Sequence, residues 1–119
     1  MHVEIRKADD IVIVDLRGKL TAGLGDAILR ETIDELLAES WKKILLNLSG
    51  VSFVDSAGVG ELVAGLRTAR RLGASLKVLS ANERVQSTLY IAKLLPIFEI
   101  YREESEALAA FSAPPPPAS

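Results

Sequence analysis

Hydrophobic and polar side chains alternate at the start of the chain, as in a half-buried strand. In residues 2–6, Val3 and Ile5 fall on one face and charged side chains on the other. Residues 8–10 have the composition of a tight turn, and residues 11–17 form a run rich in β-branched residues that ends at a glycine. The pattern predicts an antiparallel hairpin at the start of a sheet.

The period then changes to that of helices. Apolar residues recur at helical spacing in residues 25–40 and 59–72, with charged residues between them, and Gly73 ends the second run. Residues 43–48 are apolar on both faces, which favours a central strand covered on each side. The stripe expected to be buried on the second helix is Val59, Leu62, Val63, Leu66 and Ala69.

Shorter elements follow in the C-terminal third. Strands are predicted at residues 76–79 and 98–101, and Asn82 and Ser105 are expected to cap a third and a fourth helix. The residues assigned to the inner faces of these helices are Val85, Leu89 and Ala92 in the third, which must end before Pro96, and Leu108 and Phe111 in the fourth.

Strands that alternate with helices predict an α/β fold. We expect a mixed, mainly parallel sheet with an N-terminal antiparallel hairpin at one edge and about four helices. The length of 119 residues fits a single domain, assigned to residues 1–111. The tail, residues 112–119, contains four consecutive prolines and is expected to be disordered or extended, either as a frayed end or as a ligand for an SH3-like groove.

Charge and composition exclude several classes of function. Fourteen Lys and Arg against sixteen Asp and Glu give a net charge of −2, too weak a field to attract a nucleic acid. The chain has no cysteine, its apolar runs are too short to span a bilayer, and its start lacks the apolar core of a signal peptide. We therefore expect a cytoplasmic protein without membrane insertion and without direct nucleic-acid binding.

Catalytic groups are scarce. The single histidine, His2, lies near a terminus, so neither a histidine-based triad nor a two-histidine metal site is expected. Gly23-Leu24-Gly25 is similar to the start of a dinucleotide fingerprint, but Ile28 replaces its third glycine. The other interpretation is a flexible turn in which Asp26 complements a helix dipole. We expect no enzyme activity, no metal and no cofactor.

The segment Asp55-Ser56-Ala57-Gly58-Val59-Gly60 lies at a strand-to-helix junction. Unpaired N–H groups at the start of a helix favour an anion, so a phosphate on Ser56 would be tolerated despite its charged neighbour Asp55. The alternative is that Asp55 or Ser56 only caps the helix.

A second feature of this helix is a face on which long charged side chains are nearly absent. Small residues allow another backbone to approach closely, so this face is a candidate docking surface, with Ser56 at its edge and Arg67 and Arg71 beside it. The alternative is that its glycines are simply tolerated, at about 1 kcal/mol each. The residues of this face are Ala57, Gly60, Glu61, Ala64, Gly65 and Thr68.

Taken together, these stretches resemble the STAS domain family of bacterial anti-sigma factor antagonists and sulfate-transporter tails. The resemblance covers nearly the whole chain, and the block with Asp55-Ser56 is its specific part. It is carried by Gly18-Lys19-Leu20, the block from Ile44 to Leu62, the Gly73 turn, Leu94-Leu95 and Phe98-Glu99-Ile100.

The resemblance implies a regulatory role. Such antagonists bind an anti-sigma factor that is also a serine kinase, and so release a sigma factor. The kinase phosphorylates the serine after the aspartate, here Ser56, and a metal-dependent serine phosphatase reverses the reaction. Thr21 stands where many members carry an acidic residue, and Ala57 stands where many have a second hydroxyl, which leaves Ser56 as the one phosphoacceptor at the motif.

Two other functions remain open at this stage. One is a constitutive STAS adaptor for a transporter or signalling scaffold, with or without nucleotide binding, in which Ser56 has no regulatory role. The other is a two-component receiver domain, which is similar in length and also alternates strands and helices but needs an early acidic pair for Mg²⁺. No such pair follows an early strand of this chain.

Overall fold

The computed structural model describes residues 1–80, 82–91 and 100–112. Five strands form one sheet in the order β1-β2-β3-β4-β5, with β1 antiparallel to β2 and the other neighbours parallel. This confirms the predicted α/β fold with an N-terminal hairpin. The strands are β1 (His2–Ala8), β2 (Ile11–Leu20), β3 (Lys43–Val54), β4 (Ser75–Leu79) and β5 (Ile100–Tyr101).

The strand order also decides against the receiver interpretation. In a receiver-like fold the first strand is internal to an all-parallel sheet of order 2-1-3-4-5. Here β1 lies at an edge and runs antiparallel to its neighbour.

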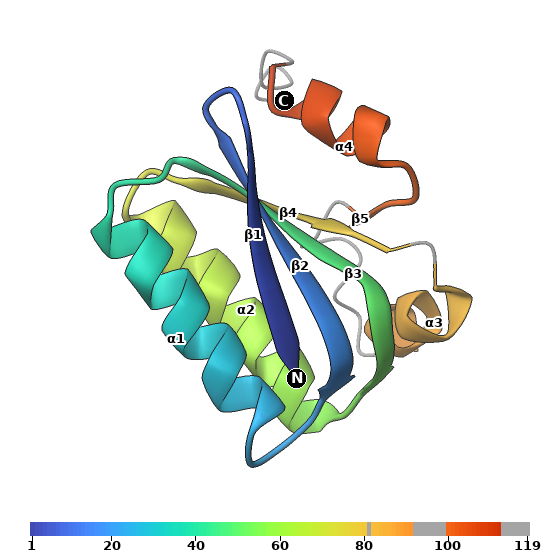
Figure 1. Ribbon diagram of the computed structural model, residues 1–119. Coiled ribbons are helices and arrows are strands. Elements are labelled where there is room, and N and C mark those ends of the chain that lie inside the picture. The colour runs from blue at the N-terminus through green and yellow to red at the C-terminus, as the bar shows by residue number, and fades with distance from the viewer. Residues whose placement is uncertain (81, 92–99, 113–119) are drawn as a thin grey trace, which may run out of the picture.

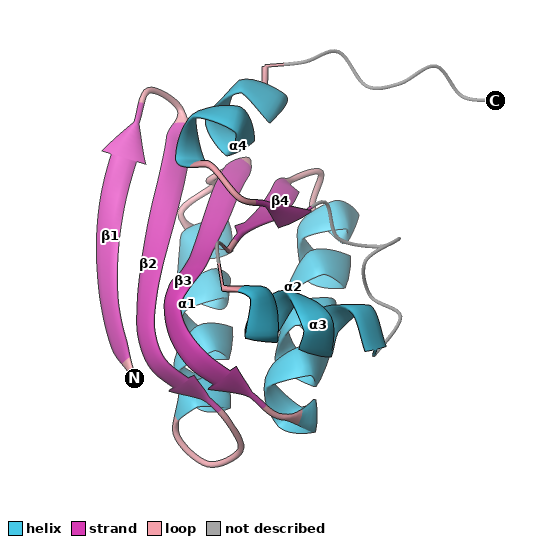
Figure 2. Cartoon of the chain, turned by 90° about the vertical axis from the view of Figure 1, so that its right-hand side faces the viewer, coloured by secondary structure: helices cyan, strands magenta, loops and turns pink. Residues whose placement is uncertain are grey.

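Four helices cover the sheet unequally. α1 (Gly25–Ala38) and α2 (Ser56–Arg71) lie side by side on one face. α4 (Glu104–Ala110) crosses the opposite face near the β1–β2 turn, and α3 (Glu83–Ile91) packs beside β3 (Figure 1). Seen from the side, the long strands separate α1 from α4 (Figure 2). The described helices match the predicted number.

The core has two parts because the two faces of the sheet are covered differently. The larger part lies under α1 and α2, where Leu29 and Ile33 of α1 and Leu62 of α2 pack on alternate residues of β2 and β3. Leu66 and Ala69 of the predicted stripe are also buried, whereas Val59 and Val63 are half-buried. The smaller part, under α4, consists of Ile11, Ile13, Leu45, Leu79, Ala107 and Phe111.

The two central strands are longer than the pattern predicts. β2 passes through Gly18, where it was expected to end, and continues to Leu20. β3 runs from Lys43 to Val54, past the predicted end at residue 48 and through Gly50. At Gly50 a Cβ atom would lie 2.9 Å from the carbonyl oxygen of Leu16. Gly50 therefore permits close contact between the strands, next to the register shifts in their ladder.

The C-terminal elements confirm part of the prediction. The Asn82 side-chain oxygen accepts hydrogen bonds from the amides of Arg84 and Val85, at 2.9 and 3.4 Å, as expected of a cap. The fourth helix begins at Glu104 with Glu103 as its N-cap, two residues before the predicted cap, so the prediction that Ser105 caps it is wrong. The predictions for Ala92, Pro96, residues 98–99 and the proline tail concern residues outside the described part of the chain.

An ionic clamp fastens α4 to the sheet. The Arg6 guanidinium on β1 donates to Asp15 on β2 and to Glu104 on α4, each at 2.5 Å. Asn47 on β3 also donates to Asp15, at 2.8 Å. These bonds favour the charged carboxylate, with the Arg6 bond as the largest cause, so the pKa of Asp15 is lowered.

Candidate functional site

The candidate site lies where β2 and β3 end and α1 and α2 begin. β2 leads into α1 through residues 21–24, and β3 leads into α2 through the single residue Asp55. Because β2 and β3 are parallel neighbours, both connections emerge at the same edge of the sheet. Two loops that are distant in the sequence therefore meet beside Ser56.

Asp55 holds these two loops together. One carboxylate oxygen accepts a hydrogen bond from the amide of Gly58 at 2.9 Å, which makes Asp55 the N-cap of α2. The other accepts from the amide of Ala22 at 2.9 Å, in the loop before α1. The amide of Asp55 donates to the carbonyl of Leu20 at 3.2 Å.

The electrostatics of Asp55 follow from these bonds. The amides of Ala22 first, and Gly58 second, stabilise the carboxylate, so the pKa of Asp55 lies below its ordinary value. The side chain is therefore charged at neutral pH. The capping interpretation of Asp55 is confirmed, and it leaves the hydroxyl of Ser56 free for another role.

Ser56 is the first residue of α2, and its side chain is exposed. Its hydroxyl makes no hydrogen bond within the described residues. The first amides of a helix lack partners inside that helix, and the helix dipole places positive potential there. The hydroxyl is therefore accessible from solvent, and an anion beside it would meet favourable backbone electrostatics.

Two glycines allow the helices to begin so close to the end of β2. A Cβ atom on Gly58 would lie 2.2 Å from the carbonyl oxygen of Leu20, and one on Gly25 would lie 2.4 Å from that of Lys19. Both distances are far shorter than van der Waals contact. Gly58, a member of the motif at residues 55–60, is buried, so packing accounts for a glycine at this position.

The predicted docking face of α2 divides into two parts. Ser56, Gly60 and Ala64 are exposed and recur every four residues, so they form one line along the helix, here called the small-residue strip. A Cβ atom on Gly60 would meet no atom within 4 Å. Ala57 is half-buried beside this strip, and Arg67 and Arg71 are exposed as expected.

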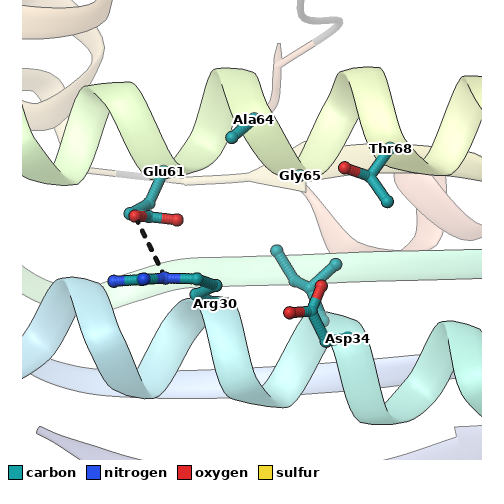
Figure 3. Close-up of a pocket in the computed structure, with 7 residues that line it drawn as sticks. Arg30, Asp34, Glu61, Ala64, Gly65 and Thr68 are labelled. Carbon is teal, nitrogen blue, oxygen red and sulfur yellow. Dashed lines mark ion pairs between the residues drawn. The ribbon is translucent and has the colours of Figure 1, made fainter.

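The rest of the face turns toward α1. In Figure 3 the side chains of Glu61 and Thr68 point from α2 toward Arg30 and Asp34 of α1, across a groove that Ala64 and Gly65 also line. The volume of this groove is about 260 Å³. An ion pair of 3.3 Å joins Arg30 to Glu61 over this groove. Ala64 belongs to the small-residue strip and also lines this groove.

We expected Gly65 to face outward on the docking surface, and that prediction is wrong. Gly65 is buried at the floor of this groove. A Cβ atom there would lie 2.6 Å from the Cδ1 atom of Ile33. Helical periodicity could not reveal this, because the spacing on α2 does not show where α1 packs.

The loop before α1 contributes through its backbone. Thr21 is half-buried next to Ala22, and its carbonyl accepts from the amide of Asp26 at 3.1 Å. Thr21 therefore lies at the site. The structure gives Gly25 a packing role, and the carboxylate of Asp26 accepts from the amide of Ala27 at 2.8 Å. These contacts fit the turn interpretation of this loop.

Sequence reasoning missed Leu20 and Ala22. Both act through main-chain atoms, and neither side-chain type signals such a role. Ala22 bonds to a residue 33 positions away, which no local motif encodes.

Within residues 1–80, 82–91 and 100–112, no group of three or more His, Cys, Asp or Glu side chains is placed to hold a metal ion. No helix in the same part of the chain is long and apolar enough to cross a membrane. What the site offers is an exposed hydroxyl beside a fixed carboxylate and a smooth strip of helix surface.

Comparison with known proteins gives closely related sequences. A protein of Thermotoga neapolitana, named as a candidate anti-sigma factor antagonist, is 35% identical over 84% of this chain and 88% of its own length. The anti-sigma F factor antagonist of Paenibacillus polymyxa is 25% identical over 91% of this chain and 92% of its own.

Solved structures agree with the fold described above. The crystal structure of a candidate anti-sigma factor antagonist from Thermotoga maritima has a TM-score of 0.86 and 28% identity, covering 93% of this chain and 95% of that one. The phosphorylated form of the Bacillus cell fate determinant SpoIIAA has a TM-score of 0.69 and 20% identity, covering 92% and 99%, a likeness of fold alone. The family model of the STAS domain matches residues 2–107, and this chain belongs to that family.

Proposed function

We propose that this protein is an anti-sigma factor antagonist that works as a phosphorylation-controlled binding switch. Unphosphorylated at Ser56, it binds an anti-sigma factor kinase and so releases a sigma factor. The observation that carries the proposal is the exposed hydroxyl of Ser56 in the first turn of α2, beside a carboxylate fixed by two backbone amides.

The relatives support the class of partner. The Paenibacillus polymyxa protein is named for its action on an anti-sigma factor, and the Thermotoga neapolitana protein carries a related name. A protein of the same fold has been solved in a phosphorylated form. Its existence shows that such a fold can hold a phosphate, as the exposed first turn of α2 would allow here.

The small-residue strip supports a close interface. Gly60 and Ala64 present no long side chain, so a partner backbone can pack directly on α2. A phosphate on Ser56 would add about two negative charges and three oxygens at the rim of that contact. Because Asp55 is fixed by its hydrogen bonds, it cannot turn away from the new charge, and the desolvation of both groups opposes binding.

In this proposal the chain acts by binding and not by catalysis. The kinase supplies the phosphate from ATP, and a metal-dependent serine phosphatase removes it. Partner contacts are assigned to the exposed strip, to the half-buried residues beside it and to the loop before α1, namely Ser56, Ala57, Gly60, Glu61, Ala64, Thr68 and Thr21.

The proposal is tested by intact-protein mass spectrometry after incubation with ATP and a lysate of the native host. The chain offers a matched control in Ser105, which is also exposed in the first turn of a helix but lies on α4. We expect one added phosphate on the wild type and on Ser105→Ala, and none on Ser56→Ala. A phosphate that persists on Ser56→Ala contradicts the proposal.

A second outcome also contradicts it. If no protein gains mass while the same lysate phosphorylates a control substrate, Ser56 is not a phosphoacceptor under conditions that support the kinase reaction. The constitutive adaptor then becomes the better account of the exposed strip.

A further inference from the structure

The free edge of β1 is a feature that the proposed function does not use. β1 is the outer strand of the sheet, and all seven of its residues pair with β2 on one side only. No other described segment pairs with its outer edge. Long exposed edges readily accept another strand, because their outward N–H and C=O groups have no partner in the sheet.

Beside this edge lies a pocket of about 320 Å³ between β1 and α1. Its β1 wall carries Val3, Ile5 and Lys7, and Trp41 closes one side, with the Lys7 ammonium 5.5 Å from the centre of the indole ring. Ile5 is 45% exposed there, although its neighbours on β2 are fully buried. Burial of this apolar side chain against a partner would be favourable, because it would remove apolar surface from water.

Two copies of β1 can pair antiparallel with residues of compatible type opposite each other near the centre. In an antiparallel pair centred on Ile5, Ile5 meets its own counterpart and Glu4 meets Arg6 of the second copy. Val3 then lies opposite Lys7 of the second copy, on the pocket side. A charged edge strand usually resists pairing, but in this register the opposed charges differ in sign.

The region of helix α1 carries negative charge that can attract Lys7 of a second copy. Glu31, Glu35 and Glu39 recur every four residues and are all exposed, and two of them line the pocket. Within the described residues none of the three forms an ion pair. In this register Lys7 of a second copy would lie opposite Val3, at the rim of the pocket that Glu35 of α1 and its C-cap residue Glu39 also line.

We propose that β1 is a self-association surface, through which two copies of this chain join their sheets in antiparallel register centred on Ile5. The contact is isologous and closed, since each copy contributes the same strand and uses up its free edge. One seven-residue strand and its flanking pocket form a small interface, so the dimer is weak and reversible. The surface is separate from Ser56, so the dimer does not depend on phosphorylation.

Sedimentation equilibrium of the full chain from about 10 µM to about 1 mM tests the proposal. We expect the weight-average mass to rise from 12.8 kDa toward twice that value and no further. Ile5→Lys places two like charges at the centre of the pair and is expected to weaken the dimer at least about tenfold. Glu4→Lys, which opposes Arg6 of the second copy, is expected to act in the same direction.

Tyr90→Lys is the matched control, because Tyr90 is 68% exposed and lies on α3, which packs beside β3, two strands away from β1. It is expected to dimerise like the wild type. A wild type that stays monomeric up to the highest concentration overturns the proposal. So does a dimer unaffected by Ile5→Lys and Glu4→Lys, or an assembly that grows beyond two copies.

Trp41 gives a second measurement in case a variant fails to fold. It is the single tryptophan of the chain and lines the pocket at the proposed contact. We expect its emission in the wild type to shift to shorter wavelength over the concentration range in which the mass rises. A rise in mass without this shift places the contact elsewhere and overturns the assignment to β1.

Discussion

At the residue scale, the glycines of α2 show how one residue type meets different constraints. Gly58 is needed because the helix starts against the backbone carbonyl of Leu20. Gly60 faces open space, and a Cβ atom added there would meet no atom within 4 Å. A glycine inside a helix costs about 1 kcal/mol relative to alanine. The fold therefore gains nothing from Gly60, which fits a residue kept small for a partner.

Gly58→Ala and Gly60→Ala should change the free energy of unfolding in opposite directions. We expect Gly58→Ala to destabilise the protein by about 2 kcal/mol, because the new Cβ atom forces α2 away from Leu20. Gly60→Ala should stabilise it by about 0.5–1 kcal/mol. Urea denaturation followed by circular dichroism measures both, and equal effects of the two variants would show that the start of α2 is packed differently.

At the element scale, periodicity predicted the type of every described helix and strand but not all of their ends. β3 continues through Gly50 because β2 packs against it there, and a contact between strands leaves no mark in local spacing. The inward orientation of Gly65 was missed for a similar reason, since it depends on Ile33 of α1. Element types follow from local patterns, whereas boundaries and exposed faces depend on neighbours in space.

α4 is a short helix that depends on its contacts with the sheet. It has seven residues, too few for a stable isolated helix, and it buries Ala107 and Phe111 on the sheet. The bond from Arg6 to Glu104 adds a polar contact at its start. α4 should therefore be the first helix to detach when its contacts are weakened.

Removal of the clamp should loosen α4 selectively. Arg6→Ala is expected to destabilise the protein by about 1 kcal/mol and to raise amide hydrogen exchange in residues 104–110, because Asp15 and Glu104 lose their shared cation. Exchange in α2 should stay unchanged. Arg84→Ala, at an exposed position of α3, is the control, and uniform acceleration across all helices would contradict a local role for the clamp.

At the scale of the whole molecule, the site arises because parallel strands bring two loops to one edge of the sheet. The sequence motif predicted an exposed hydroxyl on Ser56 at a helix start and a cap at either Asp55 or Ser56, and the structure identifies Asp55 as the cap. It could not predict that Asp55 also binds the amide of Ala22, since that bond depends on the register of β2 and β3. Ser56 is thus presented by a junction of two loops and not by one loop alone.

If a phosphate on Ser56 controls binding, as we propose, it must change the affinity of this protein for the purified anti-sigma kinase. The unmodified protein and the protein phosphorylated at Ser56 are titrated by calorimetry, with Ser56→Ala carried through the same phosphorylation reaction as the control. We predict that phosphorylation weakens binding at least about 100-fold, equivalent to about 2.7 kcal/mol, and that Ser56→Ala keeps its affinity. Equal affinities of the phosphorylated and unmodified proteins would contradict the account.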